Sequence, residues 1–247
     1  MDLRVFADLP DRDLRREGVL IGEGRLVVSR VASRCVLLGV LAEPSAAAEA
    51  EALAAGRCPC IVLSADRISA LAGYPFHRGL IAAAERPAVP VLPDRLPGRR
   101  LLVLPDPTDP VNLGATVRSA ATLGWDGFVL GPSACDPFGR RALRCSMGAT
   151  LILPAWTCGE PAHLAPLADD GWTIVAAAVE DGADGPRSLA TAGKLALMLG
   201  NERTGIGEAW RRSCARAVAI PQARKDEDGV DSLNLAAAAA ILLWEGR

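Results

Sequence analysis

The feature that most constrains the fold is a series of short, nearly continuous apolar runs in the last 150 or so residues. A strand that is apolar at almost every position must be covered on both faces, which is typical of parallel sheets. Helical stretches separate these runs. We therefore expect an α/β fold, with a parallel sheet and helices on both of its faces. The expected strands are 101–104, 127–130, 150–153, 173–179, 195–199 and 215–220, and the main helices are 113–123, 138–147, 207–213 and 233–244.

A proline-rich segment indicates where the chain divides. Prolines at positions 87, 90, 93 and 97 exclude a helix and favour an extended connector. We expect a small α/β domain in residues 1–90, a linker in residues 91–100 and a larger domain in residues 101–247. In the small domain the pattern predicts strands at 19–21, 35–41, 60–63 and 79–84, a helix beginning near 24, and helices at 45–55 and 65–72.

Composition excludes several classes of protein. The longest nearly uncharged apolar run, residues 233–244, is shorter than the roughly 20 residues that cross a bilayer. The N-terminus lacks the profile of a secretory signal, so we expect a cytoplasmic protein. Seven scattered cysteines and two isolated histidines show no metal-binding spacing, and we expect no metal. The cysteines are expected to be reduced and mostly buried.

The charge balance does not by itself point to a nucleic acid. The formal net charge is −2, so a strongly basic average is absent. An enzyme that binds one folded RNA locally needs only a basic patch. Nearly all of the basic residues are arginine, which suits bidentate contacts with phosphate.

Three loops of the larger domain carry unusual polar groups. Ligands of open parallel sheets bind where loops leave the carboxyl ends of strands. The first loop opens a helix, with Asn112 near its N-cap and Arg118 further along. Gly114, where a stronger helix former would fit, suggests close approach by another segment or a ligand.

The second and third loops follow the later strands. Gly200-Asn201-Glu202 comes directly after an apolar strand, with Gly205 beyond it. Its glycines follow neither the dinucleotide-binding nor the P-loop pattern, and a tight turn is the simplest interpretation. The third loop runs from Ile220-Pro221 to Ser232-Leu233-Asn234, where Ser232 is a natural N-cap for the alanine-rich last helix.

Taken together, the three loops resemble the signature motifs of a known superfamily. In order, the motifs are N-x-G-x-x-x-R, then G-N-E-x-x-G, and then I-P followed by S-L-N-x-A-x-A-A-A. This series resembles the TrmH/SpoU branch of the SPOUT RNA methyltransferases over residues 101–247. The segment RRALRCSMGA is similar to the family's stretch between the first two motifs. GVLIGEGRLVVSRV and FHRGLIAAA resemble the ribosomal-protein-like substrate-binding domain that precedes the catalytic domain in many members.

The resemblance implies a fold, a reaction and a site. It implies a C-terminal trefoil knot that binds S-adenosylmethionine, a homodimer formed through the catalytic domain, and methyl transfer to a ribose 2′-hydroxyl of structured RNA, ribosomal more than transfer RNA. The implied catalytic residues are Asn112, Arg118, Glu202, Ser232 and Asn234, and the implied cofactor-binding residues are Leu199, Gly200, Asn201, Glu202, Gly205, Ile220, Pro221, Leu233 and Asn234.

Two roles are open for Arg118. The family mechanism makes it the proton acceptor, but a guanidinium group stays protonated at neutral pH. Arg118 could instead bind the phosphate beside the target ribose and stabilise the developing alkoxide. Glu202 could offset the positive charge of the sulfonium or orient Asn112.

Other functions remain as alternatives. Residues 222–231 form an insertion with a charged run, and Gln222 stands where a methionine is common in the family. The simplest interpretation of the insertion is a solvated surface loop, although these departures lie in the segment expected to wall the adenine and put the geometry of the cofactor site in question. The rival hypothesis is an RNA-binding protein that keeps the fold without turnover, and the presence of all five candidate catalytic residues argues against it. Methylation of a base nitrogen, as in another SPOUT branch, is disfavoured by the S-L-N motif combined with the early Arg118.

Overall fold

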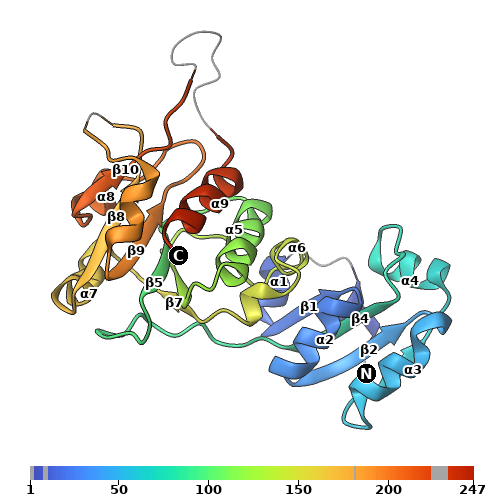
Figure 1. Ribbon diagram of the computed structural model, residues 1–247. Coiled ribbons are helices and arrows are strands. Elements are labelled where there is room, and N and C mark those ends of the chain that lie inside the picture. Colours follow the sequence, from blue (N-terminus) through green and yellow to red (C-terminus); the bar gives the residue numbers. More distant parts are fainter. Residues whose placement is uncertain (1–2, 8–10, 181, 224–232) are drawn as a thin grey trace. The chain divides into compact units, whose positions relative to one another are not determined.

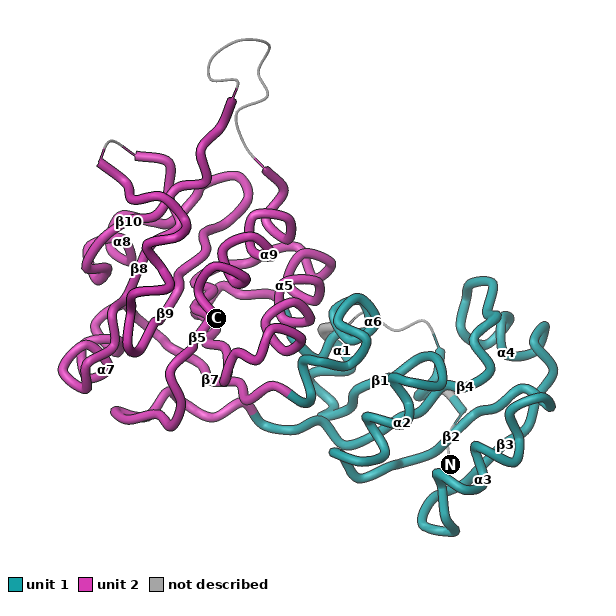
Figure 2. Tube along the Cα trace, viewed as in Figure 1, with its two compact units in different colours: residues 1–88, 136–152 teal, residues 89–135, 153–247 magenta. Residues whose placement is uncertain are grey.

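The chain folds into two compact units. The computed structural model describes residues 3–7, 11–180, 182–223 and 233–247. One unit contains residues 1–88 together with 136–152, and the other contains residues 89–135 and 153–247 (Figure 2). The sequence predicted contiguous domains, so the membership of residues 136–152 in the first unit is a departure from that prediction. Within the described ranges, no helix is both long and apolar enough to cross a lipid bilayer.

The first unit is built on a four-stranded sheet. Its strand order is β1-β4-β2-β3, with β4 antiparallel to both of its neighbours and β3 parallel to β2. The inner strand β4 is buried at every position except its last, which explains its apolar sequence. The elements are β1 (Val19–Glu23), β2 (Leu37–Ala42), β3 (Cys60–Val62), β4 (Leu80–Glu85), α1 (Asp11–Arg16), α2 (Arg25–Arg34), α3 (Ala47–Ala54), α4 (Ala65–Ala72) and α6 (Arg140–Cys145), with 3-10 helices at Leu3–Phe6, Pro44–Ala46 and Ala149–Leu151.

Residues 136–152 join the first unit through buried polar contacts. Arg140 donates to the Glu23 carboxylate from Nε, at 3.0 Å, and to the Tyr74 hydroxyl from a terminal nitrogen, at 2.9 Å. The side chains of Arg140 and Glu23 are 10% and 5% exposed. Arg86 forms a second, partly buried ion pair, with Asp136. Charged groups inside a protein are expensive unless paired, so these contacts specify where the segment packs.

The second unit is built on a parallel six-stranded sheet. Its strand order is β10-β8-β9-β5-β6-β7, and every neighbouring pair is parallel. Figure 1 shows the last helix, α9, beside α5, and the two helices are in contact. The elements are β5 (Arg100–Leu104), β6 (Gly127–Leu130), β7 (Ala155–Thr157), β8 (Trp172–Ala177), β9 (Lys194–Leu199), β10 (Arg216–Val218), α5 (Pro110–Thr122), α7 (Ala165–Asp169), α8 (Glu208–Arg212) and α9 (Leu235–Glu245), with 3-10 helices at Pro161–Leu164 and Pro186–Thr191.

Helices flank this sheet, as its apolar strands require. Ala196 and Met198 of β9 belong to a core cluster that includes Leu167 of α7 and Trp210 of α8. Leu195 points to the opposite face because side chains alternate along a strand. A Cβ on Gly246, just after α9, would come within 2.8 Å of Leu195 Cδ2. The expected fold class, a parallel sheet between helices, is therefore confirmed at this level.

One local prediction was wrong. The predicted strand at 150–153 is instead a 3-10 helix at Ala149–Leu151, and the strand in this region is β7. Turn hydrogen bonds occupy the backbone there, including Leu151 N to the Gly148 carbonyl and Gly148 N to the Ser146 hydroxyl. The other predicted strands are present, with ends shifted by a few residues.

The predicted linker at 91–100 is packed into the second unit. Leu92 and Leu96 are buried in its core. The backbone of Leu92 donates to the Thr157 carbonyl, and Thr157 donates to that of Pro90. Prolines keep this segment extended, and an extended segment can pair with the outer strand β7.

We predict that Arg140→Ala lowers the free energy of unfolding by about 3 to 5 kcal/mol, because it leaves the Glu23 carboxylate buried without its cation. Arg212→Ala is the matched control, since Arg212 and its partner Glu208 are both largely exposed. Urea denaturation followed by far-ultraviolet circular dichroism measures both variants. Equal losses in the two would contradict the role given to Arg140.

Candidate active site

The loops singled out by sequence leave strands that are close together in the sheet. β5 pairs with β9, β9 pairs with β8, and β8 pairs with β10. All four are parallel, so their carboxyl ends lie at one edge of the sheet. The loops after β5, β9 and β10 therefore begin at that edge.

Asn112 lies inside the first turn of α5. The N-cap is Asp109, whose carboxylate accepts from Val111 N at 2.8 Å, and Pro110 is the first helical residue. Asn112 therefore lies three residues after the N-cap, close to the start of the helix as expected, and Asp109-Pro110 is the start signal. Asn112 is 9% exposed and its amide is free for tertiary contacts.

The Asn112 amide connects the three motifs. Its Nδ2 donates to Glu202 Oε1 at 2.7 Å, and its Oδ1 accepts from Asn234 Nδ2 at 3.1 Å. Asn234 is the N-cap of α9 and also accepts from Ala236 N at 2.9 Å. We call Asn112, Glu202 and Asn234 the polar triad. Residues from three separate loops, up to 122 positions apart in sequence, therefore meet in one hydrogen-bonded group.

Asn201 and its glycines shape the second loop. Asn201 Nδ2 donates to the Asp106 carbonyl at 2.9 Å and to Thr108 Oγ1 at 3.2 Å, which ties this loop to the first. Asn201 and Gly205 also exchange two backbone hydrogen bonds of 2.9 Å. A Cβ on Gly200 would lie 2.3 Å from the carbonyl carbon of Gly205, and Gly205 has a φ of +67°. The glycines serve a tight turn here, the simplest of the sequence interpretations.

Arg118 does not join the polar triad. Arg118 is exposed on α5, and within the described ranges its side chain makes no hydrogen bond or ion pair. Ser232 lies outside the described residues. The prediction that Ser232 caps the last helix was wrong, since Asn234 is the cap. Leu199 is 2% exposed and its side chain packs in the core.

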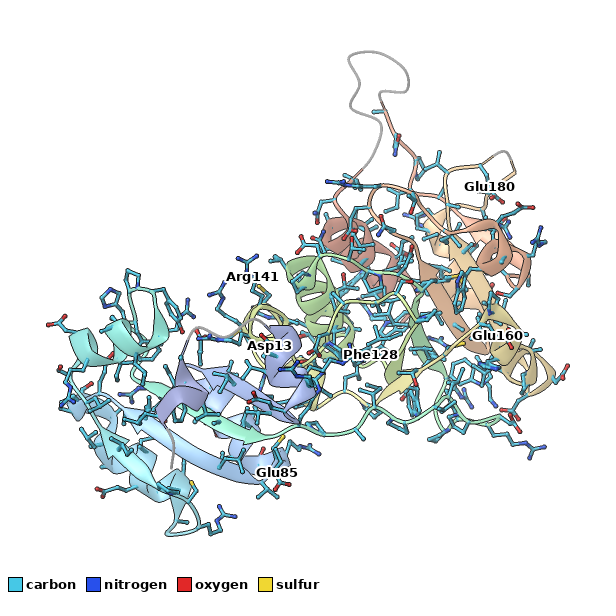
Figure 3. All side chains as sticks on the ribbon, turned by 180° about the vertical axis from the view of Figure 1, so that it is seen from behind. Asp13, Glu85, Phe128, Arg141, Glu160 and Glu180 are labelled. Atoms are coloured by element: carbon cyan, nitrogen blue, oxygen red, sulfur yellow. The ribbon has the colours of Figure 1, made fainter. Side chains whose placement is uncertain are left out.

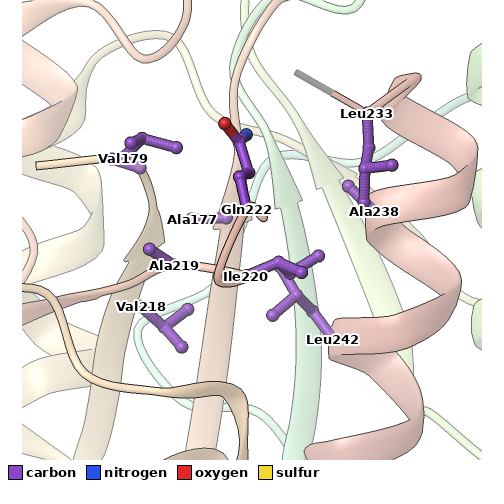
Figure 4. A pocket seen from close by; sticks show the side chains of 10 residues that line it. Ala177, Val179, Val218, Ala219, Ile220, Gln222, Leu233, Ala238 and Leu242 are labelled. Atoms are coloured by element: carbon purple, nitrogen blue, oxygen red, sulfur yellow. The ribbon is translucent and has the colours of Figure 1, made fainter. Parts of the chain in front are cut away.

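An apolar hollow lies at the same edge of the sheet. It is open to solvent, and the empty space between its walls, counted together with the adjoining open solvent, is about 460 Å³ (Figure 4). Its walls come from the end of β8, the end of β10 with the residues that follow, and α9. Of the predicted cofactor-binding residues, Ile220 and Leu233 line it, whereas Pro221 and the second loop do not. Leu233 lines the hollow and the next residue, Asn234, belongs to the polar triad, so the two features adjoin.

Sequence reasoning missed most of the walls. The lining residues that it did not select are Ala177, Ala178, Val179, Val218, Ala219, Gln222, Ala238 and Leu242. The small residues at the end of β8 were a usable signal, because that loop leaves the same edge as the other three. The α9 residues gave no signal, since an apolar helix face indicates burial against any neighbour.

Asp106 is a further residue of this edge that the sequence did not reveal. It follows β5, and its Oδ1 is buried without a hydrogen-bond partner in the described structure. Burial, and then the charge of the nearby Glu202, raise the pKa of the Asp106 carboxyl above its ordinary value. The edge of the sheet thus carries two neighbouring carboxyl groups, of which Glu202 is exposed.

The cysteines and possible metal ligands add little to the site. All seven cysteines are free, and only Cys158 is fully buried, so the expectation of mostly buried cysteines was wrong. Among the residues that the structure describes, no three His, Cys, Asp or Glu side chains cluster as metal ligands.

Comparison with known proteins identifies the family. The model of the SpoU rRNA Methylase family matches residues 99–244, more than half of the chain. The chain therefore belongs to the SpoU rRNA methylase family, as its three motifs suggested.

Individual relatives agree with this assignment. The chain is 35% identical to an uncharacterized tRNA/rRNA methyltransferase of Mycobacterium bovis, over 97% of this chain and 86% of that protein. It is 28% identical to the 23S rRNA (guanosine(2553)-2′-O)-methyltransferase of Bacillus subtilis, over 76% of this chain and 72% of the relative. A crystal structure of an AdoMet-bound rRNA methyltransferase from Sinorhizobium meliloti has the same fold, with a TM-score of 0.84 at 23% identity, covering 100% of this chain and 92% of that one.

We predict that Asp106→Asn raises the free energy of unfolding at pH 7. A raised pKa in the folded protein means that folding disfavours the ionised carboxylate, so stability is lost as pH rises through that value. The advantage of the variant should vanish below about pH 4, where the carboxyl group is protonated in both states. Urea denaturation across this pH range measures the effect.

Glu180→Gln is the control with the opposite sign. The hydrogen bond from Arg211 lowers the pKa of Glu180, which lies in the loop after β8 (Figure 3). Compared with wild type, Glu180→Gln should have a lower free energy of unfolding at neutral pH, and the difference should disappear in acid, where Glu180 is protonated in wild type. Asp106→Asn and Glu180→Gln profiles of the same sign would contradict the assignment.

Proposed function

We propose that this protein transfers a methyl group from S-adenosylmethionine to a ribose 2′-hydroxyl of structured RNA, ribosomal rather than transfer RNA. The observation that carries the proposal is the polar triad beside the apolar hollow. Membership of the SpoU rRNA methylase family supports the reaction class, and the names of relatives such as the Bacillus subtilis enzyme support the 2′-O position.

The residues present fit S-adenosylmethionine. A flat purine ring suits an apolar hollow with few polar groups, which is the usual character of a small-molecule site. The charged methionine part and sulfonium suit the adjoining polar edge, where Glu202 provides a negative charge. When bound, this cofactor supplies a methyl group activated by a positively charged sulfur.

The side chains of the site have separable tasks in this reaction. Methylation of a ribose hydroxyl would require a group in the site that accepts the hydroxyl proton. Asn112 holds one oxygen of Glu202, so the exposed carboxylate is oriented to receive that proton. Arg118, which is exposed and permanently cationic, binds the phosphate beside the target ribose.

The C-terminal segment is proposed to form the family's trefoil knot. The contact of the last helix, α9, with the first helix of the second unit, α5, supports this arrangement. So does the hydrogen bond from Trp125 Nε1 to the Leu243 carbonyl, which spans 118 positions and ties the end of α9 to the segment after α5.

We further propose a homodimer that forms through the second unit. The outer face of α9 carries Ala237, Ala240, Ile241 and Trp244, spaced as one helical stripe, and the last two are 41% and 54% exposed. An exposed apolar stripe of this kind is typical of a protein–protein interface. Arg118 lies on α5, which packs beside α9, so Arg118 and the proposed interface belong to neighbouring helices.

We expect the Arg118 variants to separate the two roles of this residue. RNA from cells that lack the gene is incubated with purified protein and methyl-labelled S-adenosylmethionine, and 2′-O-methylated nucleotides are mapped. Arg118→Ala should abolish turnover. Arg118→Lys should restore a substantial part of it if Arg118 binds phosphate, because lysine keeps the charge. Thr122→Ala, an exposed change on the same helix, is the control.

The outcomes distinguish the alternatives. Absence of S-adenosylmethionine binding in calorimetry would refute the proposed enzymatic function. Binding without a mapped methyl group would favour the RNA-binding protein without turnover. A methyl group on a base nitrogen would keep the fold and replace the mechanism.

We predict that Trp244→Glu converts the protein into a monomer, because it places a charge in the apolar stripe. Sedimentation velocity at micromolar concentration measures the mass. Glu245→Gln, a change at a half-buried neighbour outside the stripe, should leave the dimer intact. A wild-type protein that sediments as a monomer would refute the dimer.

A further inference from the structure

Among the residues that the structure describes, the apolar hollow is lined by one polar side chain. Of the ten lining residues, nine are alanine, valine, isoleucine or leucine, and the tenth is Gln222. In Figure 4 the Gln222 carboxamide lies between Val179 and Leu233, with Ile220 below it. A lone amide in such a wall is the group that can discriminate between ligands of similar shape.

The amide of Gln222 has no partner within the described ranges. Its side chain makes no hydrogen bond there, and the residue is half-buried. A ligand that fills the hollow removes water from this amide. Leaving a desolvated amide unpaired costs free energy, so a ligand that pairs with it is favoured over one that does not.

The chemistry of a carboxamide specifies what it can pair with. It presents one acceptor and one donor side by side. Adenine offers the complement, an exocyclic amino group beside a ring nitrogen acceptor, and glutamine recognises adenine in this way in nucleic acid complexes. The apolar walls, which include Ile220 and Leu242, suit the faces of the ring.

The rest of the site is consistent with a base in the hollow. The negative charge of Glu202 and the amides of Asn112 and Asn234 lie at the adjoining edge. They suit the end of the cofactor that carries the positively charged sulfonium and the zwitterionic amino acid group. Since Leu233 and Asn234 are consecutive, one ligand can contact both features.

We propose that Gln222 is a specificity-determining residue that reads the 6-amino group of the adenine ring. This inference rests on the proposed function, because it takes S-adenosylmethionine as the occupant of the hollow. It gives the side chain at position 222 a role that a methionine there could not perform.

The test is a double-mutant cycle between protein and ligand. Calorimetry measures the binding of S-adenosylhomocysteine and of its analogue with hydrogen in place of the 6-amino group. The full-length protein is compared with Gln222→Met, which keeps the length of the side chain without the amide. Wild type should bind the analogue about two- to tenfold more weakly, the value of one net hydrogen bond, and Gln222→Met should bind both ligands equally.

A second variant separates recognition from a general change in the hollow. Val179 also lines it and is exposed, so Val179→Met alters the apolar wall without touching an amide. This variant should change both affinities by the same factor and keep the preference for S-adenosylhomocysteine. Thermal denaturation of each variant verifies that it is folded.

The outcomes separate this inference from the function beneath it. Failure of the wild-type protein to bind either ligand would overturn the proposed function. Equal binding of the two ligands by wild type, or a preference that persists in Gln222→Met, would overturn the role of Gln222 and leave the proposed function standing.

Discussion

The site depends on one side chain, the carboxamide of Asn112. Its two ends bind Glu202 and Asn234, so it holds together residues from the first, second and third motifs. The side chain is almost fully buried, and a buried amide that lost either partner would be costly. The same contacts therefore position the Glu202 carboxylate and the start of α9, the helix whose Ala238 and Leu242 line the apolar hollow.

The parallel sheet makes this meeting possible. Because β5, β9, β8 and β10 are neighbours that run in one direction, four loops leave the same edge. Asn201 then ties the loop after β9 to the loop after β5, and Gly200 allows its close turn. Apolar strands and polar loops thus have separate tasks: the strands fix the edge, and the loops place the chemistry along it.

Much of this could be predicted from the sequence, for identifiable reasons. Uninterrupted apolar runs predicted the buried strands, and the resemblance to the family's motifs pointed to Asn112, Glu202 and Asn234. Periodicity could not reveal that Asp136–Ile152 packs with the first unit, because that depends on single ion pairs such as Arg140–Glu23. Periodicity also could not find Asp106, because the residues around it are distant in sequence. Nor could it distinguish the α9 residues that line the hollow from α9 residues that pack in the hydrophobic core. Cap residues were misassigned where two candidates lay within a few positions, as with Ser232 and Asn234.

We propose that the polar triad and the apolar hollow form a single binding site, and a crystal structure of the protein with S-adenosylhomocysteine is the sharpest test. We expect the base within the hollow, against Ile220 and Leu242, and the sulfur at the edge formed by Asn112, Glu202 and Asn234. A ligand bound elsewhere, or bound in the hollow with its sulfur directed away from these three residues, would refute a single binding site.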